Sequence, residues 1–182
     1  MANNWLICGC SPFVIANEYS VSNRPIIYAD KLDMVKELMG ECTTIGLNYF
    51  PLQCDYRFVM DCGHVVTTHQ VGERLVIPRE LLPELRYYNS VGREALLIEP
   101  YYTYDIGTEL SCVNSVCEPA IEYAYKQGAD AIILLGVDLT EGWQSKQRTD
   151  ATKQIIYKYP NVYKVNEKSE VDVPLWNREN LN

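Results

Sequence analysis

The pattern of hydrophobic and polar positions is clearest between residues 115 and 138. Residues 131–135 (Ala-Ile-Ile-Leu-Leu) are apolar without alternation, which is typical of a strand buried on both faces of a parallel sheet. Before them, residues 115–127 place apolar and polar positions at helical spacing, and Gly128 follows, as expected where a helix ends. The Ser115-Val-Cys-Glu118 sequence matches a capping box. A helix that leads into a buried strand predicts half of a doubly wound α/β domain.

The rest of the chain extends this pattern. Five more apolar segments predict strands, at residues 5–9, 25–30, 43–48, 56–61 and 161–165. Three segments predict helices, at residues 12–19, 31–39 and 153–158. We therefore expect a single Rossmann-like domain over residues 1–165, with a doubly wound, mostly parallel sheet. The polar tail, residues 166–182, should dock through Pro174 and Trp176.

Residues 62–107 break the regular alternation of strands and helices. Segments 64–69 and 73–78 fit either a helix or short strands. Tyrosines gather in this part of the chain, at positions 87, 88, 101, 102 and 104. One interpretation is a lid whose tyrosines stack on a base or a sugar. The other is that these tyrosines belong to strands or to an interface, including one between copies of the chain.

Composition narrows the class of protein. A chain of 182 residues with 47% hydrophobic and 22% charged residues fits one globular domain. A net charge of −8 argues against a nucleic-acid partner. No apolar run approaches the roughly 20 residues of a membrane span, and the N-terminus has no secretory pattern. These features predict a cytoplasmic protein without a membrane span.

The seven cysteines do not predict a metal centre. Their spacing is irregular, and there are only two histidines, His64 and His69. Structural zinc sites usually need two closely spaced ligand pairs. Cys8-Gly-Cys10 is the nearest match, but Cys8 falls in a predicted buried strand, where a thiol acts as a small hydrophobic group. We expect reduced cysteines and no metal.

Small or polar residues recur where the predicted strands end. They are Gly9, Asp30, Asn48, Asp61 and Asp138. Open α/β sheets bind ligands in the crevice beyond the carboxyl ends of their strands, so the set indicates a polar ligand site. Any single one could instead cap the helix that follows. The three-glycine dinucleotide fingerprint is absent, and a nicotinamide or flavin cofactor is therefore not expected.

Four short motifs, taken in order, resemble a known superfamily. They are Ile7-Cys-Gly-Cys-Ser-Pro12, Gly46-Leu-Asn48, a strand that ends in Asp61, and Asn114-Ser115 opening a helix into Leu135-Gly-Val-Asp138. The superfamily comprises bacterial sialyltransferases and related 6-hydroxymethylpterin pyrophosphokinase-like domains, many from lipopolysaccharide loci or phage genomes. The resemblance runs from Trp5 to Thr140, with a gap in the tyrosine-rich middle. It implies a Rossmann-like fold that binds a nucleotide.

The resemblance also implies which residues bind. In the sialyltransferases the first glycine turn and the Asn after the third strand hold the CMP part of the donor, and the polar pair before the late helix meets phosphate or sugar. The nucleotide-binding positions carried over are Gly9, Cys10, Ser11, Asn48, Asp61, Asn114 and Ser115. Asp138 would fix the loop or bind a ribose hydroxyl. Independently, the free N–H groups of a helix beginning at Ser115 would favour an anion by up to about 2 kcal/mol.

Two departures from the family pattern bear on catalysis. The family turn usually reads Gly-Asn-Gly-Pro-Ser, whereas this chain has Cys10 and Ser11 after Gly9. The sialyltransferases take their base from a histidine downstream of the late strand, but here no histidine follows Asp138. His64, close in sequence to Asp61, is then the predicted catalytic base. Lys146, Arg148 and Lys153 could stabilise the phosphate leaving group, or could simply be a solvated helix face.

Three functions remain open at this point. The first is a metal-independent glycosyltransferase-like protein that takes a nucleotide sugar, a CMP-sugar above all, as donor substrate and a hydroxyl group as acceptor. The second is a diphosphokinase-like enzyme that uses ATP and magnesium held by Asp61 or Asp138. The third is a module that binds a nucleotide without catalysis. Magnesium dependence separates the second from the others, and turnover separates the first from the third.

Overall fold

In the part of the chain that the structure describes, the protein is built on a seven-stranded parallel sheet. The computed structural model describes residues 2–19, 25–59, 72–78, 101–104, 115–139 and 145–177. The strands are β1 (Asn4–Cys8), β4 (Thr43–Leu47), β5 (Tyr56–Phe58), β6 (Arg74–Pro78), β7 (Tyr101–Tyr104), β8 (Ala131–Leu135) and β9 (Val162–Lys164). Their order across the sheet is β7-β6-β5-β4-β1-β8-β9, and every neighbouring pair is parallel.

The sheet is doubly wound. From β1 the chain moves outward through β4 and β5 to β7, and it then returns to place β8 on the other side of β1. Cys8, at the end of β1, lies opposite both Gly46 of β4 and Leu135 of β8. The carboxyl ends of these three strands therefore meet at one edge, where the change in winding direction opens a crevice in folds of this kind.

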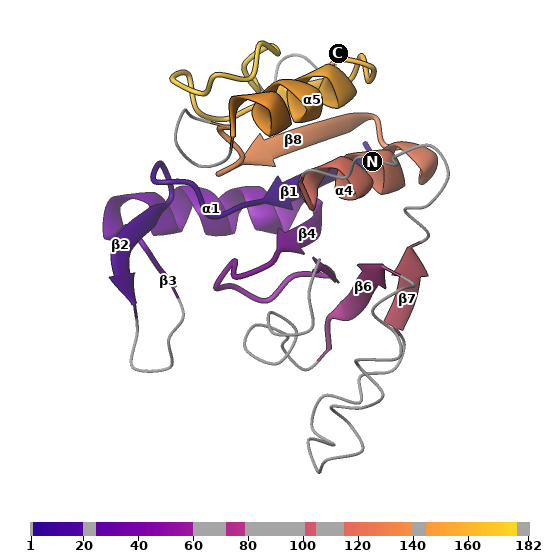
Figure 1. Ribbon diagram of the computed structural model, residues 1–182. Helices are drawn as coiled ribbons and strands as arrows, with labels where there is room; N and C mark the ends of the chain where they lie inside the picture. Colours follow the sequence, from indigo (N-terminus) through magenta and orange to yellow (C-terminus); the bar gives the residue numbers. More distant parts are fainter. Residues whose placement is uncertain are drawn as a thin grey trace.

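Helices cover both faces of the sheet (Figure 1). On one face, α1 (Ala29–Glu41) buries Val35 and Leu38 in a cluster with Leu6 of β1. On the other face lie α4 (Cys117–Lys126) and α5 (Lys146–Ile156), whose Ile121 and Ile156 share a second cluster. The predicted α/β, Rossmann-like, doubly wound fold is confirmed.

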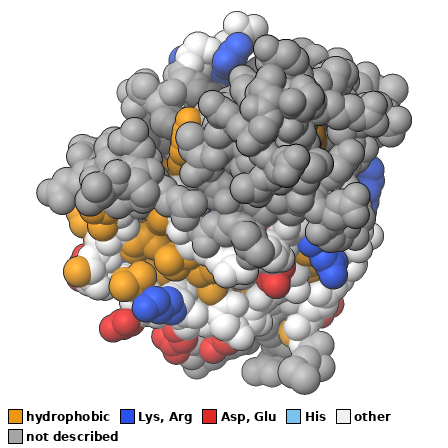
Figure 2. All heavy atoms as spheres, turned by 90° about the horizontal axis from the view of Figure 1, so that it is seen from below, with side chains coloured by type: hydrophobic (Ala, Val, Ile, Leu, Met, Phe, Trp, Pro, Cys, Tyr) orange, Lys and Arg blue, Asp and Glu red, His pale blue; other side chains and the backbone are white. Residues whose placement is uncertain are grey.

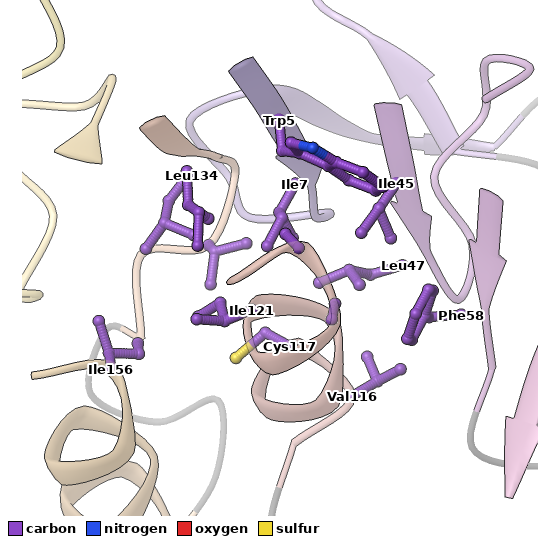
Figure 3. Close-up of a cluster of buried hydrophobic side chains, with 14 of the residues drawn as sticks. Trp5, Ile7, Ile45, Leu47, Phe58, Val116, Cys117, Ile121, Leu134 and Ile156 are labelled. Atoms are coloured by element: carbon purple, nitrogen blue, oxygen red, sulfur yellow. The ribbon is translucent and has the colours of Figure 1, made fainter. Parts of the chain in front are cut away.

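The core under α4 shows why this helix forms where it does. Cys117, Ala120, Ile121 and Ala124 follow the i, i+3, i+4, i+7 spacing of one helical face, and all four are buried. Figure 3 shows this face directed at side chains of the sheet, among them Ile7, Ile45 and Phe58. Burying one such isoleucine contributes roughly 1.5–3 kcal/mol. The burial of this face, more than helix propensity, holds α4 in place.

The segment after β1 corrects one prediction. Residues 12–19 do not form a helix: residues 12–14 turn, with the Val14 and Ile15 amides bonded to the Ser11 carbonyl at 3.0 Å each. The chain then enters β2 (Ile15–Tyr19), which pairs antiparallel with β3 (Pro25–Ile27). The β-branched Val14 and Ile15 are buried against the α1 side of the sheet, and such residues favour extended backbone. Burial here favours the extended chain over the predicted helix.

The predicted strand at residues 25–30 is therefore only partly correct. Residues 25–27 are β3, but they belong to the separate two-stranded ribbon, and α1 already begins at Ala29.

Two large hydrophobic side chains near this ribbon are exposed: Ile26 and Tyr28 each have 39% of their surface exposed. Figure 2 shows hydrophobic side chains gathered on the side of the molecule where β2, β3 and α1 lie in Figure 1. A homo-oligomer stays a prediction.

The predicted capping box is wrong. Helix α4 begins after Val116 and has no side-chain cap. The Glu118 side chain is fully buried and accepts a 2.6 Å hydrogen bond from the Thr152 hydroxyl of α5. Ser115 Oγ instead accepts from the Cys117 amide at 3.3 Å. The carboxylate that would have closed the box is used to join two helices.

The remaining predictions concern the middle and the end of the chain. Within the proposed lid, residues 62–107, the structure describes only residues 72–78 and 101–104, which contain the main-sheet strands β6 and β7. Helix α5 begins at Lys146, earlier than predicted. Docking of the tail is confirmed, since the Trp176 amide bonds to the Lys164 carbonyl at 2.8 Å and the Lys164 amide bonds to the Pro174 carbonyl at 2.9 Å.

Among the described residues, no helix has both the length and the hydrophobicity that a membrane span requires.

Replacing Gly136 should test the crossing of the β1 and β8 ends. Gly136 has φ +67°, and a Cβ there would lie 2.5 Å from the Gly9 carbonyl oxygen. Gly128 has φ +74° but open space around it. We expect Gly128→Ala to lower the free energy of unfolding by about 1–2 kcal/mol, the cost of the left-handed backbone. Gly136→Ala should lose about 2–5 kcal/mol, because overpacking adds to that cost. Equal losses in urea denaturation would contradict the crossing.

Candidate functional site

A pocket opens at the carboxyl ends of β1, β4 and β8. It has a volume of about 530 Å³, including the solvent at its mouth. Four separate segments of the chain contribute to it: the turn after β1, the end of β4, the start of α4 and the loop after β8. The lining residues are Gly9, Cys10, Ser11, Pro12, Leu47, Asn48, Ser115, Val116, Cys117, Gly136, Val137, Asp138 and Leu139.

The structure brings most of the predicted binding residues together here. All those within the described residues line this one pocket, namely Gly9, Cys10, Ser11, Asn48, Ser115 and Asp138. Asp61, Asn114 and the predicted base His64 lie outside the described residues. Of the basic candidates on α5, Lys153 forms a 3.1 Å ion pair with Glu170, and Lys146 and Arg148 are exposed. No lysine or arginine is among the described residues of the lining.

The first turn is fixed against the loop after β8. The Gly9 amide donates to the Leu135 carbonyl at 2.7 Å, and the Ser11 amide donates to the Gly136 carbonyl at 3.0 Å. The Ser11 hydroxyl donates to the Asp138 carboxylate. It also accepts from the Phe13 amide at 3.3 Å. The glycine turn is thus held in one conformation before any ligand arrives.

Asp138 links this turn to the C-terminal tail. Its carbonyl accepts from the Glu170 amide at 3.2 Å and from the Ser169 hydroxyl at 3.4 Å. Asp138 is itself only 4% exposed. Asp138 was expected either to fix the loop or to bind a ribose hydroxyl. The structure shows the first role, since the carboxylate accepts the hydrogen bond that holds the turn at Ser11. A contact with a ribose hydroxyl remains a prediction.

Asn48 has the most unusual geometry in the pocket. Its φ is +44°, and Leu139, which also lines the pocket, has φ +49°. They are the two non-glycine residues in the described chain with positive φ, a conformation that costs of order 1–3 kcal/mol and that clusters at functional sites. The side-chain oxygen of Asn48 is buried and has no hydrogen-bond partner in the described structure. A buried acceptor without a partner is costly, and a ligand donor would satisfy it.

Helix α4 begins at the pocket. Ser115, Val116 and Cys117 all line it, so the positive end of the helix dipole faces this space. The Ser115 hydroxyl donates to the Cys117 sulfur at 3.1 Å. Asp138, the one carboxylate among the described lining residues, is engaged by Ser11. The start of α4 is therefore the part of the pocket best suited to an anion.

Two thiols in the pocket are kept neutral. Burial raises the pKa of Cys10 to about 12, although the nearby Arg57 charge opposes this. Burial likewise raises the pKa of Cys117 to about 12, against the bond with Ser115. Behind the pocket, burial also raises the pKa of Cys8 well above its usual range. Neutral thiols are poor nucleophiles and poor metal ligands. In the described ranges no group of three His, Cys, Asp or Glu residues is placed to hold a metal ion.

Reasoning from the sequence missed two kinds of residue. The apolar walls Leu47, Val116 and Leu139 carry no chemical signal in a sequence. Arg57 and Glu73, both fully buried, form an ion pair directly behind the Asn48 loop. Arg57 did leave a signal, because a charge near the start of the predicted strand 56–61 needs a partner when the strand is buried. Glu73 left none.

Comparison with known proteins does not identify a family for this chain. No family model matches the chain, and no curated protein or solved structure is significantly similar to it.

The raised thiol pKa values predict a loss of stability in base. In the unfolded chain a thiol ionises near pH 8.5, whereas Cys10 and Cys117 stay neutral to about 12 in the folded protein. Their contribution is complete below pH 8.5 and is lost as the pH rises toward 12. Between pH 7.5 and 9.5, under reducing conditions, we expect the free energy of unfolding to fall by on the order of 1 kcal/mol per thiol. In the Cys10→Ser, Cys117→Ser double variant the fall should be smaller; an unchanged pH dependence would refute the assignment.

Proposed function

We propose that the pocket binds the nucleotide part of a nucleotide sugar, with a CMP-sugar as donor, in a glycosyltransferase-like protein that uses a hydroxyl acceptor. One observation carries the proposal. Residues far apart in the chain, chosen from their resemblance to sialyltransferase motifs, line one pocket at the carboxyl edge of the sheet, where folds of this kind bind ligands.

The charge of the pocket favours one phosphate over two. The start of α4 supplies the equivalent of about half a positive charge, and the described lining contains no lysine or arginine to add to it. A nucleoside monophosphate sugar places a single phosphate next to the nucleoside, whereas UDP- and GDP-sugars carry two. A CMP-sugar is therefore the better match for this site. Ser115, at the start of α4, would turn its hydroxyl from the Cys117 sulfur to donate to the phosphate.

The uncharged groups of the pocket would hold the nucleoside. The side-chain oxygen of Asn48, which has no partner within the described part of the chain, can accept from a hydroxyl or an amino group. The apolar walls, such as Leu47, Val116 and Val137, can contact a base or a sugar ring. Catalysis would need a base near the acceptor hydroxyl, and His64 is the residue we propose for it. The neutral Cys10 and Cys117 are not suited to that role.

Nucleotide-dependent thermal stabilisation tests the site. A ligand at 100 times its dissociation constant stabilises the folded state by about 2.7 kcal/mol, or roughly 5–10 °C for a domain of this size. We expect CMP to produce such a shift without magnesium, ahead of UDP, GDP, ATP and NAD. Asn48→Gly and Ser115→Ala should each reduce it. Glycine can keep the left-handed backbone of residue 48 while it removes the side chain with its carboxamide.

The controls separate the other two functions. Gln147→Ala, on the exposed surface of α5, should leave the shift unchanged. A shift that requires both ATP and magnesium would favour the diphosphokinase-like enzyme. CMP binding with no release of CMP from a CMP-sugar, over a range of hydroxyl acceptors, would favour the binding module. No shift with any of the five nucleotides would contradict the proposed function.

A further inference from the structure

Behind the pocket, a buried ion pair occupies the α1 face of the sheet. Arg57 of β5 and Glu73, just before β6, each have a fully buried side chain. Arg57 Nε donates to Glu73 Oε2 at 3.1 Å, and Nη2 donates to Oε1. Glu73 Oε1 also accepts from the Cys54 amide at 2.9 Å. Burial opposes the charge of Arg57, but the hydrogen bond to Glu73 and the charge of Glu73, together with the nearby Cys54 and Cys10, raise the pKa of the guanidinium.

The rest of the guanidinium holds the loop between β4 and β5. Nη1 donates to the Phe50 carbonyl at 2.7 Å and to the Asn48 carbonyl at 3.3 Å. Nη2 donates to the Leu52 carbonyl at 2.8 Å. An arginine has five N–H donors, and with Glu73 these bonds account for all five. Arg57 therefore has no donor left for a ligand, and it can act on the pocket only through the loop.

Stability alone does not explain this arrangement. A buried ion pair often adds no net stability over a well-packed apolar pair, because desolvation offsets the attraction. What the pair does provide is geometry: Arg57 fixes three carbonyls in the first part, 48–52, of the loop 48–55. The first of these residues is Asn48, at the pocket.

Both backbone groups of Asn48 are consequently constrained. Its amide donates to the Phe58 carbonyl at 3.0 Å, and its carbonyl accepts from Arg57. Between these two bonds the residue adopts φ +44°, and its side-chain oxygen has no hydrogen-bond partner among the described residues. Left-handed backbone in a non-glycine residue persists where the surroundings impose it.

We propose that Arg57 and Glu73 are positioning residues of the pocket. They impose the left-handed backbone conformation of Asn48 and so present its side-chain carboxamide to the bound ligand. This inference rests on the proposed function, in that the ligand is the nucleotide. Gly46 of β4 is part of the same device. A Cβ at this position would lie 2.7 Å from Arg57 Nη1 and 2.8 Å from Cζ, so the absence of a side chain makes room for the guanidinium.

Arg57→Lys is the first test. Lysine keeps the charge opposite Glu73, but its three donors cannot replace five in a planar fork. We expect a folded protein whose affinity for CMP, measured by calorimetry, falls at least tenfold. In the Arg57→Lys, Asn48→Gly double variant the loss should match that of Asn48→Gly alone within about twofold, because Arg57 acts through Asn48. Multiplicative losses would overturn the inference.

Gly46→Ala is the second variant, and it provides the test if Arg57→Lys does not fold. It displaces the guanidinium and removes no polar group. The same tenfold loss of affinity is expected. Val35→Ala, in the core under α1 and outside the pocket, is the matched control for general destabilisation. It should bind CMP as the wild-type protein does at temperatures where it is folded; an equal loss in Val35→Ala would overturn the positioning role.

A ligand-free measurement separates this inference from the proposed function. Crystal structures of the wild-type protein and of Arg57→Lys, or of Gly46→Ala, should show Asn48 leaving the left-handed region only in the variant. If Asn48 keeps φ near +44° there, the positioning role is wrong whatever binds. If Asn48 moves but the wild-type protein does not bind CMP, the positioning role stands and the nucleotide proposal fails.

Discussion

The whole site depends on the close crossing of two chain segments at Gly9 and Gly136. A Cβ on either glycine would overlap the carbonyl oxygen of the other. This contact brings the end of β1 against the end of β8, the two strands between which the sheet reverses its winding. The turn after β1 and the loop after β8 are then joined by the bond from Ser11 to Asp138. Without this crossing the central wall of the pocket would not exist.

The opposite wall is held by a different force. There the Arg57–Glu73 pair fixes the loop after β4 through charge-assisted hydrogen bonds in a site from which water is excluded. The pocket thus lies between one loop fixed by backbone proximity and one fixed by a buried charge. Rigid walls of this kind reduce the entropy that a ligand must overcome on binding. The start of α4 completes the site, and the apolar face of that helix holds it against the sheet (Figure 3).

The sequence predicted the sheet well because the signals are local. An apolar run such as residues 131–135 predicts a strand without any knowledge of its partners in the fold, and the glycine after α4 predicts the end of that helix in the same way. The errors arose where tertiary contacts decide. Because Val14 and Ile15 are buried, the segment predicted as a helix forms a turn and β2 instead. The Glu118 carboxylate binds the hydroxyl of Thr152, which is distant in sequence, and does not close the predicted capping box. Gly9, Asn48 and Asp138 were found because strand ends in parallel sheets converge, and Cys10, Ser11 and Ser115 were found from the resemblance to sialyltransferase motifs. Glu73 was not found, since its role appears only when β5 and β6 pair.

The central claim, that the pocket binds a nucleotide, is tested most directly by titrating the ¹⁵N-labelled protein with CMP and following its amide resonances. The largest shifts should fall on Gly9, Asn48, Ser115 and Leu139, which come from the four segments that line the pocket. Saturable shifts confined to another part of the surface would contradict it, as would spectra that do not change at millimolar CMP.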